Sequence, residues 1–167
     1  YRESGVPFIR TSDIINFGIN SRPTKYVSSD VLDSFRQRSS ISEGDLLFVA
    51  DGRYRIGNVG ILTKYDLDIV IQSHLKIIKC HSDTIDGFLL LYLLSHPLVN
   101  RQIRDLVVIQ STLGTIGKRI ESIQLPIPND DKRRREISVS VRKWILSKAK
   151  SHSNLESMHS NFSNYST

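Results

Sequence analysis

The sequence predicts an α+β domain in which a mixed, mostly antiparallel curved sheet carries short helices and is followed by a C-terminal amphipathic helix. Three observations predict this class. Short apolar runs separated by turns indicate strands, two segments between residues 83 and 107 have helical spacing, and the composition changes after Pro128. We therefore expect a domain over residues 1–128, a helix over 129–150 and a polar, flexible tail over 151–167.

The first part of the chain predicts two strands and one short helix. VPFI at 6–9 is an apolar run of strand length, and residues 30–38 predict a helix capped by Ser29 or Asp30. LLFVA at 46–50 follows the turn SEGD. Because this run is apolar throughout, we expect it to be a central strand buried on both faces.

A hairpin and a further strand are expected next. VGILT at 59–63 predicts the strand that returns from LLFVA, and DGRYRIGN at 51–58 is the long tip between them. IVIQSHLKIIKC at 69–80 predicts one long strand, or two strands divided at its polar centre, where glutamine, serine and histidine are adjacent.

Two helices and an exit segment complete the domain. Residues 83–95 have helical apolar spacing and a cap at Asp83 or Thr84, and residues 97–107 begin with a proline at the first helical position. SIQLPIP at 122–128 contains two prolines, which restrict it to an edge strand or an exit from the domain.

Charge and composition limit the classes of function. The net charge is +6, of which residues 1–128 carry only +2 and residues 129–167 carry +4. Nucleic-acid binding by the main body therefore requires a local patch. The single cysteine, Cys80, excludes an internal disulfide and a cysteine-based zinc site, so we expect a reducing, cytoplasmic compartment. No apolar run is long enough to span a membrane. The only methionine is Met158 and the sequence starts at Tyr1, so we expect a fragment of a longer protein.

The glycines of GTIG at 114–117 stand directly before Lys118 and Arg119. The spacing excludes a Walker loop, because Thr112 occupies the position of its first glycine and Arg119 that of its hydroxyl residue. Two interpretations stay open. The glycine amides and adjacent cations face a phosphate, or the segment is a chain reversal with solvated charges.

Catalysis is not predicted. The metalloprotease and serine-hydrolase motifs are absent, and the five histidines have no metal-ligand spacing. We assign no catalytic residue, no metal and no cofactor to this chain.

Binding is predicted instead, because polar and basic side chains recur in the loops between the predicted strands. Arginine, glutamine, serine and threonine hydrogen-bond to base edges, and lysine and arginine also hold phosphates. The candidate DNA-binding residues are Arg10, Thr11, Ser12, Arg22, Lys25, Tyr26, Arg53, Tyr54, Arg55, Gln72, Ser73, His74, Gln110, Ser111, Thr112, Lys118 and Arg119. The hairpin tip with Arg53, Tyr54 and Arg55 is the first choice for base reading.

The predicted C-terminal helix carries an apolar stripe of Ile137, Val141, Trp144 and Ile145. A stripe of this spacing covers one face of a helix. We expect it to pair with a partner or with a second copy of the chain; the alternative is that it packs back on its own domain.

Four blocks of the sequence, taken in order, resemble a target recognition domain of a type I restriction-modification specificity subunit, or of a methyltransferase with a fused copy. They are GVPFIRTSDI at 5–14, GDLLFVADGxxxIGNVGIL at 44–62, IQSHL at 71–75 and QSTLGTIG…LPIP within 110–128. The basic helix that follows resembles the helix that pairs with its mate in such proteins.

The resemblance implies sequence-specific binding of duplex DNA without catalysis by this chain. A partner methyltransferase subunit would methylate adenine with S-adenosylmethionine, and a restriction motor subunit would join the complex. Two recognition domains read the two halves of a split site in this family, so a single domain implies a homodimer or a second recognition domain. The residues that read bases differ with the target and are not implied by the resemblance.

Two other functions are consistent with the sequence. GxxG followed by cations is similar to the loop of a KH domain, which binds single-stranded RNA, although that loop joins two helices. The second hypothesis is a protein-interaction module that docks through its basic helix.

Overall fold

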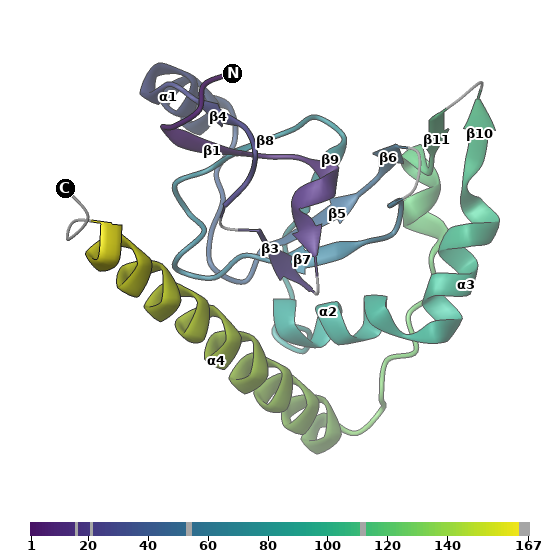
Figure 1. Ribbon diagram of the computed structural model, residues 1–167. Coiled ribbons are helices and arrows are strands. Elements are labelled where there is room, and N and C mark those ends of the chain that lie inside the picture. Colours follow the sequence, from purple (N-terminus) through teal and green to yellow (C-terminus); the bar gives the residue numbers. More distant parts are fainter. Residues whose placement is uncertain (16, 21, 53–54, 111–112, 164–167) are drawn as a thin grey trace.

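A computed structural model describes residues 1–15, 17–20, 22–52, 55–110 and 113–163 (Figure 1). The predicted α+β class is confirmed, with several small sheets in place of one continuous sheet. At the centre, β5 (Leu46–Val49) lies between β7 (Val59–Ile61) and β9 (Leu75–Ile78), and both pairings are antiparallel. The expected central strand and its returning partner are therefore both present.

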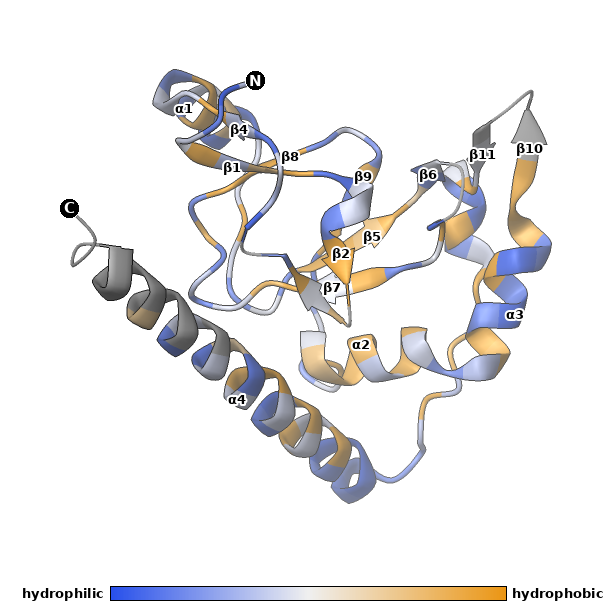
Figure 2. Ribbon diagram, viewed as in Figure 1, coloured by the Kyte–Doolittle hydropathy of each residue, from blue (hydrophilic) through white to orange (hydrophobic). Residues whose placement is uncertain are grey.

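The two faces of β5 belong to two different cores, because successive side chains of a strand point to opposite faces. Leu46 and Phe48 pack in the core beneath the helices. Leu47 and Val49 pack in a second core with Ile9 and other aliphatic side chains of the strands. All four β5 side chains are fully buried, which is why this strand is apolar throughout. Figure 2 shows the apolar colour of β5 and α2.

A second sheet is built on β1 (Val6–Ile9), which pairs antiparallel with β4 (Tyr26–Val27) and parallel with β8 (Val70–Ile71). The segment 69–80 thus forms two strands, β8 and β9, separated by residues 72–74. The parallel β1–β8 pair matters for the site, because parallel strands end at the same edge of a sheet.

A third sheet has the order β10–β11–β6, with β10 at Val108–Gln110, β11 at Leu113–Thr115 and β6 at Asp51–Gly52. Gly114 of β11 lies opposite Gly52 of β6. A Cβ added at Gly114 would lie 2.8 Å from the terminal carbon of the Ile56 side chain, which would have to shift. Gly114 is therefore a strand residue, and not part of a turn as the GTIG pattern suggests.

The hairpin of β2 (Ile14–Ile15) and β3 (Gly18–Ile19) is the fourth sheet. At its end Phe17 has φ of +63°, a conformation that costs a residue with a side chain roughly 1–2 kcal/mol. The Phe17 carbonyl accepts a hydrogen bond of 3.1 Å from the Ile61 amide, which fixes the hairpin against β7.

The helices are α1 (Ser29–Arg38), α2 (Gly87–Ser95), α3 (Pro97–Leu106) and α4 (Asp131–Ser163), with short 3-10 helices η1 (Thr11–Asp13) and η2 (Gly117–Ser122). The predicted helices at 30–38 and 97–107 are present, and Pro97 is the first residue of α3. The cap position of α1 is Ser28, so the predicted caps Ser29 and Asp30 are wrong and both lie in the first turn of the helix. Residues 122–128 form no strand and lead out of the domain to α4.

Helix α2 begins later than the sequence predicts. Its cap is Asp86, whose carboxylate accepts a hydrogen bond of 2.8 Å from the Leu89 amide, so Asp83 and Thr84 stay outside the helix. Gly87 follows the cap because the chain passes the Gly44 carbonyl there, where an added Cβ would lie only 2.0 Å from the oxygen. Asp83, Thr84 and Asp86 are all residue types that cap helices. The close approach of Gly87 to Gly44 fixes the start of α2 after Asp86.

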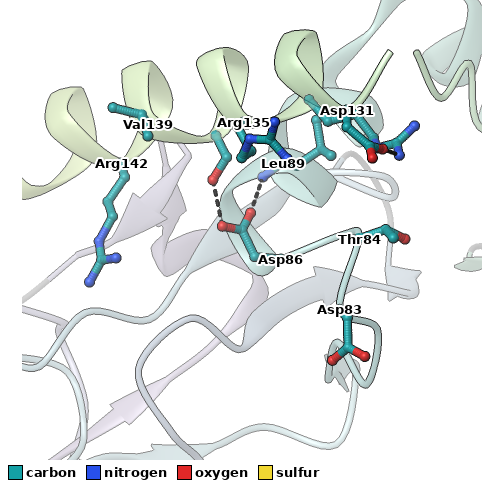
Figure 3. Close-up of a pocket in the computed structure, with 10 residues that line it drawn as sticks. Asp83, Thr84, Asp86, Leu89, Asp131, Arg135, Val139 and Arg142 are labelled. Carbon is teal, nitrogen blue, oxygen red and sulfur yellow. Dashed lines mark hydrogen bonds and ion pairs between the residues drawn. The ribbon is translucent and has the colours of Figure 1, made fainter. Parts of the chain in front are cut away.

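Helix α4 packs on α2 through its first half, and Figure 3 shows this junction. The Ser138 hydroxyl donates to the same Asp86 carboxylate that caps α2. Arg142 lies 5.5 Å from the centre of the Phe88 ring, and Ile145 is buried in the helical core. A pocket of about 330 Å³ lies at this junction. The alternative that the helix packs back on its own domain therefore describes this half of α4.

The second half of α4 continues past the expected boundary at Lys150 to Ser163. Residues 151–163 contain neither glycine nor proline, so no residue in this polar segment stops a helix that is already formed. Within the described residues, none of the helices is both long and apolar enough to cross a membrane.

Candidate nucleic-acid interface

The parallel pair β1–β8 brings two of the predicted binding segments together. Both strands end at the same edge, where β1 leads into η1 and β8 into residues 72–74. The Thr11 amide donates a hydrogen bond of 3.3 Å to Gln72 Oε1, and the Gln72 amide donates one of 2.9 Å to the Ile9 carbonyl. Segments 61 positions apart in the sequence thus form one surface.

Arg10 is held on this surface by two neighbours. Its Nη2 donates a hydrogen bond of 2.7 Å to Thr24 Oγ1, and its Nε lies 3.6 Å from the carboxylate of the buried Asp13. The Arg10 amide also donates to that carboxylate at 2.9 Å. The guanidinium is therefore positioned before any ligand arrives, with less side-chain entropy to lose on binding. Ser12 is exposed beside it in η1.

The loop before β4 reaches the same surface through Thr24. In this loop Lys25 Nζ lies 5.8 Å from the centre of the Tyr1 ring, and the Lys25 carbonyl accepts a hydrogen bond of 3.0 Å from Phe8. Tyr26 pairs with β1 and is partly buried. The Arg22 amide donates to the Asn20 side chain. Lys25 and Tyr26 therefore lie beside β1, next to the Arg10 contact rather than within it.

Asp51 connects the third sheet to this surface. Its carboxylate accepts a hydrogen bond from the Thr115 hydroxyl of β11, and its other oxygen lies 3.8 Å from His74 Nδ1. The His74 carbonyl accepts a hydrogen bond of 3.0 Å from the Ala50 amide. One side chain thus links β6, β11 and the turn at 72–74. Ser73 is exposed at this turn.

Arg55 is the described member of the predicted hairpin tip. Its Nη1 reaches the Ile14 carbonyl at 3.5 Å, and the residue is exposed. Arg53, Tyr54, Ser111 and Thr112 lie outside the described residues. The backbone of Gln110 belongs to β10.

Lys118 and Arg119 have different surroundings in η2. Arg119 donates hydrogen bonds of 2.9 Å to the carbonyls of Leu106 and Thr115, so its guanidinium joins α3 to the end of β11. Lys118 is exposed. Gly117 has φ of +53° and begins η2, which makes it the turn residue of this stretch. Arg119 therefore has a structural role, because it bonds to the backbone, whereas the exposed Lys118 is the cation that is placed to meet a phosphate.

Side-chain contacts join Thr24 to Arg10, Thr11 to Gln72, and Asp51 to both His74 and Thr115, and the chain itself connects Arg10 to Thr11 and Gln72 to His74. We call this set the loop surface. Sequence reasoning missed Thr24, Asp51 and Thr115, although an aspartate that directly follows an apolar strand was a visible signal. In Figure 1 the sheet of β6, β10 and β11 lies on the side of the molecule away from α4.

The chemistry of the loop surface is that of hydrogen bonding and charge. Within the described part of the chain, no group of three or more histidine, cysteine, aspartate or glutamate side chains is arranged to hold a metal ion. Cys80 lies elsewhere, and burial, with smaller contributions from Asp86 and Asp45, raises the pKa of its thiol. A thiol with a raised pKa is a poor nucleophile.

A scan of the chain against protein-family models finds no matching family, and a search of curated proteins finds no matching protein.

Proposed function

We propose that this chain is the sequence-specific duplex-DNA recognition module of an adenine-methylating restriction-modification system, acting in the cytoplasm without catalysis of its own. The observation that carries the proposal is the loop surface, where polar and charged residues that follow β1 and β8 lie beside residues of β6 and β11 and are joined by side-chain contacts. S-adenosylmethionine belongs to a partner methyltransferase subunit in this proposal, and a restriction motor subunit completes the assembly.

The composition of the loop surface supports base reading. Sequence is read in the major groove by arginine, glutamine, asparagine, serine and threonine, while phosphates are held by lysine, arginine and backbone amides. Arg10 and Gln72 of the loop surface supply the first kind of group. Outside this set, exposed Arg55 is a further group of the first kind and exposed Lys118 one of the second. Arg10 is already oriented by Thr24 and Asp13, as a base-reading side chain should be.

The blocks that carry the family resemblance are also neighbours in space. The first block contains β1 and η1, the second β5 to β7, the third the turn after β8, and the fourth β11 and η2. They meet through the pairs Ile9–Ile71, Val49–Leu75 and Asp51–Thr115. A chance similarity of separate short motifs does not require them to pair with one another in one fold.

The KH-like alternative has less support. In a KH domain the GxxG loop joins two helices. Here Gly114 is paired within β11 and Gly117 begins a short 3-10 helix. The glycine amides therefore belong to a strand and to a helix start, not to one open loop between helices.

The test is selection of a binding site from random duplex DNA, followed by measurements on Arg55→Ala. Arg133→Ala on α4 is the matched control, because Arg133 is also exposed and its ion pair is with Glu136, one turn along the same helix. We expect Arg55→Ala to reduce discrimination between the selected site and random DNA by about 1–3 kcal/mol, with no such effect from Arg133→Ala. An equal loss on all sequences would instead make Arg55 a phosphate contact. If no sequence is enriched from the pool, the proposal fails.

A further inference from the structure

Two aromatic side chains that the DNA proposal does not use meet on another part of the molecule. Phe17, at the end of the β2–β3 hairpin, and Trp144 of α4 have ring centres 6.1 Å apart in an edge-to-face arrangement. Phe17 is 41% exposed and Trp144 is 50% exposed. We call this pair, with the pocket beside it, the aromatic patch. Large exposed aromatic residues that touch one another are typical anchors of protein interfaces.

The backbone of Phe17 is the second observation. A bulky residue with φ of +63° is an outlier, and a glycine would adopt this conformation without strain. Gly18 is the next residue, so a glycine lies only one position away from the residue that takes the strained conformation. Strained residues persist where the surroundings hold them, and they are concentrated at binding sites. Phe17 is thus kept at a position where its ring is partly exposed.

A pocket adjoins the Phe17 ring. It has a volume of about 230 Å³ and is walled by Ile14, Val59 and Leu94, with Asn58, Ser95 and Asn100 at polar positions. Among the described residues that line it, none is acidic or basic. Its size suits one bulky aliphatic or aromatic side chain. The Ser95 hydroxyl and the Asn100 amide already donate to backbone carbonyls of α2 and its C-cap, so the apolar wall is the part of the pocket that receives this side chain.

Charge indicates the kind of segment that fits. Residues 131–150 of α4 contain eight basic and two acidic residues. Lys148 Nζ lies 5.5 Å from the centre of the Trp144 ring, and burial lowers the pKa of this ammonium. A partly desolvated cation at the edge of an apolar patch gains from a carboxylate on the partner.

We propose that the aromatic patch is a docking site for an acidic protein segment that places one bulky apolar side chain beside Phe17 and carboxylates near Lys148. The inference goes beyond DNA recognition and does not depend on it. In Figure 1, α4 lies on the side of the molecule away from the hairpin β10–β11.

The test is selection of a random peptide library, displayed on phage, on the intact chain without DNA. We expect the enriched peptides to contain one bulky apolar residue flanked by aspartate or glutamate, and to bind more weakly as salt is raised. Trp144→Ala should weaken them about tenfold or more. Tyr65→Ala is the matched control, because Tyr65 is 49% exposed and has Lys64 5.1 Å from its ring centre.

Phe17→Gly separates a binding role from a structural one. Glycine removes the ring and relieves the strained φ, so peptide binding should fall while thermal stability is kept or raised. A lower stability together with unchanged peptide binding would overturn the proposal, because the ring would then serve the fold.

Other occupants are distinguished by the same variants. Peptides that bind Trp144→Ala and the native chain equally, or that lack acidic residues, overturn the proposal. A native dimer that Trp144→Ala converts to a monomer in sedimentation would assign the patch to a second copy. Loss of duplex-DNA binding in Trp144→Ala would assign it to DNA. The peptide selection contains no DNA, so its failure leaves the DNA-recognition proposal unaffected.

Discussion

Replacing Asp51 tests the contacts that hold the loop surface together. Its carboxylate accepts from the Thr115 hydroxyl and lies 3.8 Å from His74 Nδ1. A hydrogen bond to a charged group contributes about 1.5–3 kcal/mol when buried. The Asp51 side chain is 29% exposed, so we expect about 1 kcal/mol after solvent screening. The histidine contact is too long for a hydrogen bond and adds little. The Thr115 bond therefore dominates.

The assay is urea unfolding of the native chain, Asp51→Asn, Thr115→Val and the double variant. We expect each single change to lower the free energy of unfolding by about 1 kcal/mol, which corresponds to about 2–4 °C in Tm for a chain of this size. The double variant should lose less than the sum, since both changes remove one interaction. Asp105→Asn on α3, an exposed aspartate, is the control. The reasoning would be refuted if the double variant lost the sum of the two single losses in free energy of unfolding. Equal losses of free energy in Asp51→Asn and Asp105→Asn would also refute it.

Asp51→Asn also has an expected effect on DNA. The change weakens the bond between Asp51 and Thr115 of β11, beside the turn at 72–74, without removing a cation. The selected sequence should therefore change or become less defined, while the dependence of binding on salt keeps its slope. A change in slope with an unchanged sequence preference would indicate that Asp51 acts through charge alone.

Four further predictions follow from individual side chains. Lys118→Ala should reduce the salt slope of duplex-DNA binding by about one and leave urea unfolding unchanged, since Lys118 is exposed. Arg119→Ala should lower the free energy of unfolding by about 0.5–1.5 kcal/mol, because two exposed hydrogen bonds to backbone carbonyls are lost where water can replace the donor. Ile145→Ala should cost about 2–5 kcal/mol in the same assay. Cys80 should react with iodoacetamide more slowly than a free thiol at pH 8 and faster as pH rises, because burial and two carboxylates raise its pKa.

The elements that follow from local pattern were predictable. The unbroken apolar run at 46–50 specified a central strand, because only a strand buried on both faces lacks polar alternation. Pro97 specified the start of α3, since its ring favours the first helical turn. The division of 69–80 into two strands was left open, and the structure places it at the polar residues 72–74.

The features that depend on distant parts of the chain were not predictable. The parallel pairing of β1 with β8 requires segments about sixty residues apart to meet, and it brings Thr11 to Gln72. Ile145 and Trp144 are both apolar and adjacent in α4, yet one is buried in the core and the other half exposed. The sequence pattern shows only that the helix has an apolar stripe, whereas the position of α2 decides which part of that stripe is covered.

The most direct test of the central claim is equilibrium binding of the intact chain to random-sequence duplex DNA over a series of salt concentrations, with single-stranded RNA measured in parallel. The account predicts a preference for duplex DNA and a linear fall of log K with log salt, with a slope of about −0.9 for each phosphate contacted. A preference for single-stranded RNA, or no binding to duplex DNA at any salt concentration, would contradict it.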